Sequence, residues 1–484
     1  MGENQTTDQV VTEEVGLKKS LKFSYVFALA TGSIFTFIGY WDSMFFRYCG
    51  PGTFLAFLLM SALILPIAFV YCELAPLFPS CGGELIYNTV GLNKHFGFLS
   101  AWLIMAAWIA VPPAAVMAIV TWIYGLFGAT PDLWVLIVIS IVLLIGYCFM
   151  SLQSVEIAGK AQVVMLALAI AGCIISSIAF MCSGQWSFEN FTKFFANENK
   201  EIYGQAIPEW FGWIIGMALL ITPFFGFETV PQMVEEADFP VQKSTVAIWG
   251  SVVTCGIIYA FFFFGIAGMD WEPVLNGAAH DGYLAIYIMR QLGGPGFDGW
   301  DVFSIIFGIA AILCAIGTCL LGFWLSTVRL LYAMGKQNFL PKSFAKLNKH
   351  QQPILPNIVL LVVSIVFVLL QFIPGDFMQN FFNLMAFGCA VAYAVTMVSA
   401  MRLHKKHPEW VSPYHLKGGN ITRVIALIIA LVVAVFCALG QGWQSWLCFG
   451  IWFAIGIGLW IWMMLVKWKK EKVVITTPDG DQEF

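Results

Sequence analysis

Long apolar stretches recur along almost the whole chain, and they constrain its fold more than any other feature. Hydrophobic residues make up 60% of the 484 residues, whereas charged residues make up only 11%. The mean hydropathy is +0.83. Because one bilayer crossing needs roughly 20 apolar residues, these stretches have room for about a dozen crossings. The sequence therefore predicts an integral membrane protein and excludes a single-span receptor or a soluble enzyme of ordinary size.

A scan for apolar windows of about 19 residues predicts twelve membrane helices. They are expected near residues 22–41, 52–74, 96–126, 132–150, 155–182, 209–236, 244–268, 301–334, 355–373, 376–402, 421–440 and 444–467. The longest connections, 183–208 and 270–300, have room for short surface helices but not for a core of their own. The expected fold class is an all-α membrane protein with twelve transmembrane helices.

The distribution of basic residues predicts the orientation of these helices, because Lys and Arg in short loops stay on the cytoplasmic side. With the N-terminus inside, all 24 Lys and Arg face the cytoplasm except Arg47, Lys193, Lys200 and Arg290. The opposite loops are acidic and hold Glu189, Glu198, Glu201, Asp270, Glu272 and Asp281. The first 20 residues are polar and acidic, unlike a cleaved signal peptide. A multi-pass protein of the cell (cytoplasmic) membrane is expected, with both termini cytoplasmic.

Several function classes are excluded by charge and by motif content. The net charge of -4 and the pI of about 5.9 offer no basic face to a nucleic acid. The twelve cysteines are scattered through apolar runs without metal or disulfide spacing, so they are interpreted as small apolar side chains. Neither an HExxH run nor a GxSxG elbow occurs. We therefore expect no nucleic-acid partner, no metal, no cofactor, no catalytic residue and no enzymatic activity.

Two of the predicted helices are interrupted at corresponding places. In the first, Ala30-Thr31-Gly32-Ser33 is followed by Gly39. In the sixth, Thr222-Pro223-Phe224-Phe225-Gly226 lies in mid-membrane, and Pro231 follows. Pro removes a backbone donor and Gly holds a helix weakly, so both sites can free N–H and C=O groups where lipid offers no partner. Protein or a ligand must then satisfy these groups.

The pairing of the two interruptions suggests a transporter. Helices one and six are five crossings apart, so two five-helix halves would lie in opposite orientations, as in transporters with inverted repeats. In such proteins the substrate binds between broken helices near the midplane. The alternative is that Gly and Pro merely kink ordinary membrane helices.

Three sequence motifs resemble those of the amino acid, polyamine and organocation (APC) transporter superfamily. The first is Glu73-Leu74-Ala75-Pro76 through Pro79, then Gly82-Gly83-Glu84 and Tyr87, between helices two and three. The second is Gly226-Phe227-Glu228, then Glu235-Glu236 and Pro240, along helix six. The third is Arg329, Tyr332-Ala333-Met334, Leu340-Pro341 and Phe344, after helix eight. Their order and spacing match the superfamily over more than half the chain.

This resemblance implies a LeuT-type fold of the amino acid permease type, with a 5+5 inverted repeat and two further helices. The expected division is a tail at 1–21, a ten-helix core at 22–402, a cytoplasmic loop at 403–420, helices eleven and twelve at 421–467 and a tail at 468–484. The chain also departs from the family. Thr36-Phe37-Ile38 stands where relatives carry small residues that receive a carboxylate, and the position of a lysine common in helix five falls near Ala169.

Glu228 is the acidic residue best placed for chemistry, because it directly follows the break in helix six. A carboxylate at membrane depth costs several kcal/mol unless it is paired, solvated or protonated. Three roles remain open. It could receive a substrate ammonium group, carry a coupled proton, or brace the unwound backbone of helix one.

The substrate site is expected where the broken segments meet. The candidates are Gly32, Ser33, Thr36 and Phe37 on helix one and Phe225, Gly226 and Glu228 on helix six. Aromatic faces attract ammonium groups, although most aromatic residues of this chain must serve packing. Trp102 and Trp108 of helix three are weaker candidates, because residues six apart do not share one helix face.

An inner gate is a further expectation. Glu235 and Glu236 end helix six, Arg329 ends helix eight, and Glu73 and Glu84 are expected near the same surface. Such charges could form ion pairs that open and close during transport. The alternative is a solvated rim where ion pairs contribute little.

The sequence is thus interpreted as a secondary active transporter of an amino acid or related small amine, with alternating access and H+ as the expected coupling ion. An exchanger, or a carrier of an amine without a carboxylate, is the alternative within transport. A nutrient sensor that does not transport is the alternative outside it. The expected partners are the small-molecule substrate and the lipid bilayer, while the oligomeric state stays open.

Overall fold

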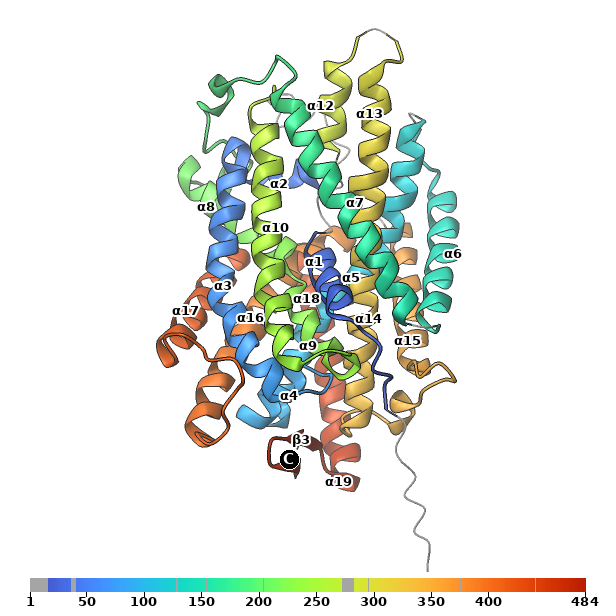
Figure 1. The fold of residues 1–484 in the computed structure, drawn as a ribbon, viewed down its shortest axis with the longest axis vertical. Helices are drawn as coiled ribbons and strands as arrows, with labels where there is room; N and C mark the ends of the chain where they lie inside the picture. Colours follow the sequence, from blue (N-terminus) through green and yellow to red (C-terminus); the bar gives the residue numbers. More distant parts are fainter. Residues whose placement is uncertain are drawn as a thin grey trace, which may run out of the picture.

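The fold is almost entirely helical (Figure 1). The computed structural model describes residues 16–35, 41–127, 129–153, 155–202, 204–271, 283–294, 296–373, 377–439 and 441–484, without the side chains of Leu126 and of 377–386. The helices are α1 (Phe23–Ile34), α2 (Asp42–Cys49), α3 (Thr53–Leu77), α4 (Glu84–Gly91), α5 (Lys94–Leu126), α6 (Leu133–Ser151), α7 (Val155–Met181), α8 (Glu209–Leu219), α9 (Val230–Met233), α10 (Ser244–Ala267), α12 (Leu284–Leu292), α13 (Gly299–Phe307), α14 (Cys314–Lys336), α15 (Ile354–Leu369), α16 (Phe377–Lys406), α17 (Asn420–Leu439), α18 (Trp443–Trp462) and α19 (Trp468–Lys470).

Short segments of other types connect or interrupt these helices. The 3-10 turns are η2 (Gly50–Gly52), η3 (Phe188–Phe191), η4 (Thr222–Phe224), η5 (Phe227–Thr229), η6 (Val234–Glu236), η7 (Val241–Lys243), η9 (Lys342–Ala345) and η10 (Leu370–Phe372). Two π-helical stretches, η8 (Gly308–Leu313) and η11 (Met463–Lys467), continue α13 into α14 and α18 into α19. Two small antiparallel hairpins pair β1 (Glu201–Ile202) with β2 (Gln205–Ala206) and β3 (Val474–Thr477) with β4 (Gly480–Glu483).

The apolar helices fit a multi-pass membrane protein. Within the described residues, 11 helical stretches are long and apolar enough to cross a membrane, and α1 is a shorter apolar helix. The predicted first helix is not described as one rod, since α1 ends at Ile34 and α2 begins at Asp42 on either side of the undescribed residues 36–40. The prediction of an all-α, multi-span fold is confirmed. The count of twelve crossings and the inverted repeat stay predictions.

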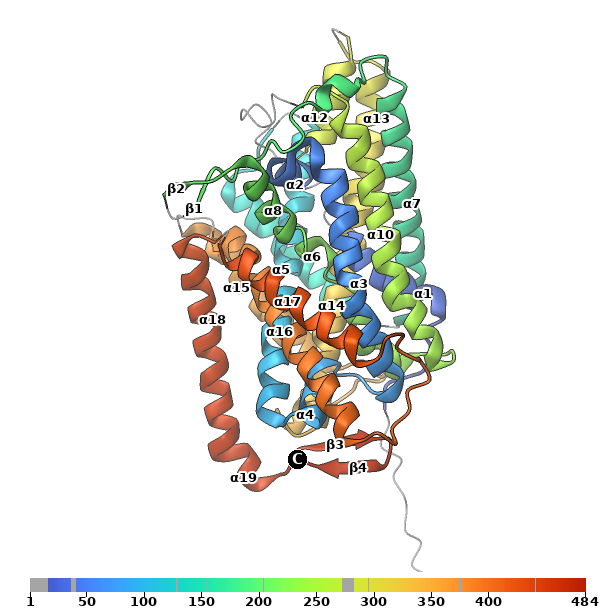
Figure 2. The same ribbon diagram turned by 90° about the vertical axis from the view of Figure 1, so that its left-hand side faces the viewer.

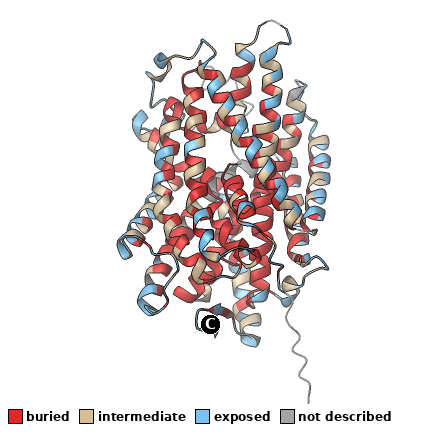
Figure 3. Ribbon diagram, in the orientation of Figure 1, coloured by how far each residue is buried: buried red, intermediate tan, exposed pale blue. Residues whose placement is uncertain are grey.

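The bundle surrounds α1, which packs against α7, α10 and α14. Helix α5 is buried on nearly all sides, whereas α6 and α18 expose most of their apolar residues, as expected for helices that face lipid. Figure 2 shows α18 at one side of the bundle. In Figure 3 the buried residues concentrate around α1, α9 and α14. We call the end that holds the C-terminus the lower end, and the opposite end, with α12 and α13, the upper end (Figure 1).

A C-terminal β-hairpin covers part of the lower end (Figure 2). The side chains of Val473 and Ile475 are buried against the bundle. The Trp410 indole donates to Asp479 Oδ2 at 2.9 Å. The Lys94 ammonium donates to the Phe484 carbonyl oxygen at 3.3 Å. This hairpin was not predicted, because residues 468–484 carry no apolar run and were expected to form only a tail.

None of the twelve cysteines, all of which are described, forms a disulfide. Ten are buried, Cys314 is half-buried, and Cys182, just after α7, is exposed. Their placement agrees with the interpretation as small packing side chains.

Candidate functional site

Helix six is broken where its Pro and Gly residues predicted. Helix α8 ends at Leu219, η4 carries Pro223, and Phe225 then adopts an extended backbone with ψ of 131°. Gly226 has a φ of +144°, a region that L side chains rarely enter. The chain resumes a helical course in η5 and α9. The interruption therefore spans Leu220 to Gly226 and divides helix six into upper and lower halves.

The break in helix six lies directly against the end of α1. A Cβ atom on Gly226 would lie 2.7 Å from the backbone N of Ile34 and 2.8 Å from Ser33 Cβ. Only a residue without a side chain permits this approach. The structure thus brings together Gly32, Ser33, Phe225, Gly226 and Glu228, all of them buried. Thr36 and Phe37 lie outside the described residues.

The last carbonyl groups of α1 receive donors from neighbouring helices, as the absence of water in a membrane requires. Cys255 Sγ of α10 donates to the Thr31 carbonyl at 3.5 Å. Thr318 Oγ1 of α14 is 3.2 Å from the Gly32 carbonyl. The Tyr259 hydroxyl of α10 donates to the Ile34 carbonyl. The end of α1 is therefore held by α10 and α14.

A neutral amide links α7 to the same region. Gln162 Nε2 donates to the Ala28 carbonyl of α1 at 3.2 Å and to the Thr318 carbonyl of α14 at 2.9 Å. Gln162 precedes Ala169, the position that the resemblance indicated on helix five, by seven residues, about two turns. The side chain of α7 that joins α1 to α14 is thus Gln162, which the sequence analysis missed. A polar residue in an apolar helix was the signal available for it.

Glu228 is fully buried beside the break. Its Oε2 accepts from the backbone N–H of Gly226 at 2.9 Å, and its Oε1 accepts from the Trp108 indole at 3.1 Å. These two hydrogen bonds join Glu228 to the backbone of helix six and to α5, whereas residues 36–40 of helix one lie outside the described residues. Glu228 takes part in none of the salt bridges between described residues, so these two hydrogen bonds hold its carboxyl group in place.

Aromatic side chains surround this carboxyl group. Tyr393 of α16 packs against Phe227, with ring centroids 5.5 Å apart, and against Phe225 at 6.4 Å. Phe35 stacks on Tyr259 at 5.6 Å. Trp102 and Trp108 of α5 lie in different places, as their spacing predicted. Trp108 reaches Glu228, whereas Trp102 stacks on Trp452 of α18 at 4.3 Å.

The upper half of helix one is attached to the segment after α10. Asp42, the first residue of α2, is fully buried. Its Oδ1 accepts from the backbone N–H groups of Ser43 and Leu284, and its Oδ2 accepts from that of Ala285, each at 2.9 Å. The carboxyl group therefore caps the first turn of α12. The sequence analysis ended its first helix at residue 41 and missed this contact.

Two ion pairs close the lower end beneath the break. Arg329 of α14 makes a two-point contact with Glu236, Nε to Oε2 at 2.8 Å and Nη2 to Oε1 at 3.0 Å, and both side chains are fully buried. Glu235 instead pairs with Lys336 at 2.8 Å and accepts from the backbone N–H of Cys81 at 3.2 Å. The sequence left open whether these charges form a gate or a solvated rim. Because both side chains are fully buried, the Arg329–Glu236 pair is not part of a solvated rim.

The other two acidic residues expected at this rim behave differently. Glu73 pairs with Arg423, with 2.6 Å between Oε1 and Nη2. Glu84 is fully buried and makes no ion pair with a described residue. Gly82 and Gly83, with φ of +128° and +43°, turn the chain against helix six, so Glu84 lies near this end but is buried and does not belong to a solvated rim.

The three motifs noted in the sequence meet at this lower end. Gln232 of helix six accepts from the Gly82 N–H at 3.0 Å, and Glu235 accepts from the Cys81 N–H. Glu236 pairs with Arg329 of the third motif. The backbone N–H groups of Ser20 and Leu21, just before α1, donate to the Glu236 carbonyl at 3.0 Å each. The start of helix one therefore contacts the same lower end.

A comparison with protein families decides the identity of this arrangement. The model of the Amino acid permease family matches residues 21–466, which is nearly the whole chain. The protein belongs to the amino acid permease family. This confirms the resemblance stated above and assigns the permease to a family of transporters, not of enzymes.

Characterised relatives of the permease are distant but extend over most of its length. The glutamate/serine transporter AimA of Bacillus subtilis is 24% identical over 87% of this chain and 77% of its own. The branched-chain amino acid permease BcaP of Lactococcus lactis is 23% identical over 88% and 89%. The methylthioribose transporter of Bacillus subtilis is 22% identical over 84% of each chain. Relatives at this distance therefore differ in what they carry.

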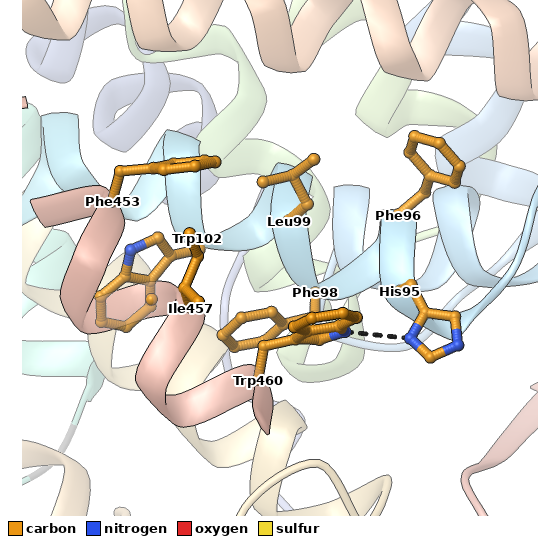
Figure 4. Close-up of a pocket in the computed structure, with 9 residues that line it drawn as sticks. His95, Phe96, Phe98, Leu99, Trp102, Phe453, Ile457 and Trp460 are labelled. Atoms are coloured by element: carbon orange, nitrogen blue, oxygen red, sulfur yellow. Dashed lines mark hydrogen bonds between the residues drawn. The ribbon is translucent and has the colours of Figure 1, made fainter. Parts of the chain in front are cut away.

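Apolar grooves beside α18 are separate from the site at the helix breaks. One, of about 250 Å³, lies between α5 and α18 and is lined by aromatic side chains (Figure 4). Two of its lining residues are joined by the hydrogen bond from the Trp460 indole to His95 Nδ1, at 3.0 Å (Figure 4). A second, of about 730 Å³, lies between α5, α14, α15 and α18. Both suit hydrocarbon chains, because an amino acid needs polar partners for its charged groups.

Proposed function

We propose that the permease is a secondary active transporter of an amino acid or related small amine, coupled to H+ and working by alternating access. The observation that carries this proposal is the contact between Gly226 at the break of helix six and Ser33–Ile34 at the end of α1. The substrate site would comprise Gly32, Ser33, Thr36, Phe37, Phe225, Gly226 and Glu228. Broken helices at membrane depth offer backbone dipoles to a charged solute.

The lower end is proposed to face the cytoplasm, because it carries most of the Lys and Arg residues. This orientation places the Arg329–Glu236 pair as an inner gate beneath the substrate site. The described structure would then be closed toward the cytoplasm. The names of the relatives AimA and BcaP support amino acids as cargo. The methylthioribose relative favours, as the second candidate, a carrier whose cargo lacks a carboxylate.

The cargo can be tested by ligand-induced stabilisation. A compound present at a free concentration of about 100 times its Kd raises the free energy of unfolding by about 2.7 kcal/mol. Purified permease would be heated with L-serine, L-glutamate, L-leucine and 4-aminobutyrate, and each stabilising compound would be tested in counterflow in liposomes. Decarboxylated amines serve as matched controls for the carboxylate. Stabilisation without counterflow would favour a sensor over a carrier.

Replacing Glu228 with Gln is expected to keep the protein folded, since Gln fills nearly the same volume. If Glu228 carries the coupled proton, uptake driven by a pH gradient should fall at least about tenfold, as loss of a proton-transferring group does. Counterflow needs no net proton movement, so it should fall less than gradient-driven uptake, and its remaining loss would measure the contribution of Glu228 to substrate binding. Glu209→Gln, an exposed residue on α8, is the control and should match the wild type. An unchanged pH profile with a normal rate in Glu228→Gln would dismiss the proton role.

A further inference from the structure

A second carboxyl group, outside the site described above, is buried without a hydrogen bond to any described residue. Glu84 is the first residue of α4 and is fully buried. Within the part of the chain that the structure describes, neither of its carboxyl oxygens has a hydrogen-bond partner. An ionised carboxylate in such a place is costly, so a neutral acid is the form that this environment favours.

Other polar groups without protein partners lie around it. The hydroxyls of Tyr71 and Tyr393 and Oδ1 of Asn88 are buried and, among the described residues, make no hydrogen bond through these atoms. The ring of Tyr71 contacts that of Tyr393 at 5.9 Å and that of Phe227 at 5.4 Å. Phe227 precedes Glu228 in η5. Tyr71 therefore lies between Glu84 and the helix-six break.

Titratable groups face Glu84 from each element packed around it. They are Tyr71 of α3, Tyr87 of α4 itself, Cys389 and Tyr393 of α16 and Glu228 of η5. From α5, the side chain that reaches this region is Ser100, which accepts from Asn88 Nδ2 at 2.7 Å. The basic residues at the start of α5 are engaged elsewhere, Lys94 with Phe484 and His95 with Trp460. The described neighbours thus supply no positive charge to Glu84.

The backbone holds Glu84 in this position. Gly83 has a φ of +43°, and a Cβ there would lie 2.6 Å from Gln232 Nε2 of helix six. The preceding N–H of Gly82 donates to Gln232 Oε1 at 3.0 Å. Glu84 therefore sits directly against the lower half of helix six, which is the half that the proposed gate would move.

We propose that Glu84 is a second proton-binding group of the permease, which receives a proton from Glu228 through the Tyr71 and Tyr393 hydroxyls and releases it toward the lower end. In this step the Glu228 O–H bond breaks, the proton passes along the hydroxyls, and an O–H bond forms on the Glu84 carboxylate. Release then needs the lower end to open and hydrate Glu84. The path rests on the proposed proton role of Glu228, but the protonation of Glu84 does not.

Burial raises the pKa of Glu84 to about 8 from its ordinary 4.5. Folded Glu84 therefore keeps a proton that the unfolded chain has lost. Because the folded form binds more protons between these values, the free energy of unfolding decreases as the pH rises from about 4.5 to about 8. Above that range the contribution is constant.

The first test needs no substrate. Purified wild type and Glu84→Gln would be compared by infrared titration and by apparent melting temperature between pH 5 and 9, a range of roughly two units on either side of neutrality. Glu84→Gln mimics the neutral acid, so it should fold, lose one protonated-carboxyl band and show a flatter decline in melting temperature. Glu471→Gln, exposed at the lower end, should match the wild type. Identical bands and melting profiles in wild type and Glu84→Gln would overturn the proposal.

The second test addresses the path. Liposomes with wild type or Glu84→Gln would be assayed for uptake of radiolabelled L-serine and L-leucine under a pH gradient, and for counterflow of the same labels. Glu84→Gln should lower gradient-driven uptake at least about tenfold and leave counterflow within about twofold. An equal loss of both activities would indicate a packing role and overturn the path. If Glu228→Gln kept the Glu84 band yet transported normally, only the role of Glu228 would fail.

Discussion

Replacing Glu236 with alanine is expected to destabilise the permease by about 3 to 5 kcal/mol. The change leaves the fully buried guanidinium of Arg329 without its carboxylate partner, and a lone buried charge is far more costly than a lost surface contact. Gln352, whose Oε1 accepts from Arg329 Nη2 at 2.8 Å, compensates only partly because it is neutral. Thermal unfolding in detergent measures the loss.

The matched control is Lys336→Ala, which removes the partner of Glu235. The Lys336 side chain is 42% exposed, so the expected loss is below about 1 kcal/mol. To test the gate itself, Glu236→Arg and Arg329→Glu would be made singly and together. The double exchange should recover part of the transport lost in each single variant. No recovery in the double variant would contradict a gate formed by this pair.

Replacing Gly226 with alanine is expected to abolish transport and to lower the free energy of unfolding by about 3 kcal/mol or more. Two costs add together. The φ of +144° strains any residue with a Cβ, and the new methyl group would lie 2.7 Å from the Ile34 backbone N, which cannot move without separating helices one and six. Melting temperature and counterflow in liposomes measure both effects.

Gly146→Ala on α6 is the control, because a Cβ there meets nothing within 4 Å. Alanine is the better helix former, so this variant should be unchanged or more stable by up to about 1 kcal/mol. A Gly226→Ala protein that kept normal stability and counterflow would show that the contact between the two breaks is dispensable. The contact between Gly226 and the end of α1 would then no longer support the proposed substrate site.

The sequence predicts the helices and the break in helix six well, because both follow from local chemistry. Apolar runs of bilayer length specify spans, and Pro223 with Gly226 cannot continue a regular helix. The three motifs could also be located in the sequence, but only the structure shows that they meet at one end of the bundle. The family match over residues 21–466 confirms what these motifs indicated.

Side-chain partners could not be predicted, since they depend on the direction of each residue around its helix. Glu235 and Glu236 are adjacent in the chain, yet one faces Lys336 and the other the buried Arg329, 93 residues further on. Glu84 was expected near a solvated rim, because a hydropathy scan does not detect the turn at Gly82–Gly83 that leads to its burial. The first span was predicted to end at residue 41, so nothing in the sequence indicated that Asp42 caps α12.

The burial of almost every thiol has a practical consequence for measuring how this protein sits in a cell. Cys182 is the one exposed cysteine, and it follows the end of α7 away from the lower end. A maleimide dye that cannot permeate membranes would therefore report on the sidedness of that surface through a native group. Reporter cysteines for spectroscopy could then be introduced elsewhere after a single Cys182→Ser exchange, without rebuilding the packed interior.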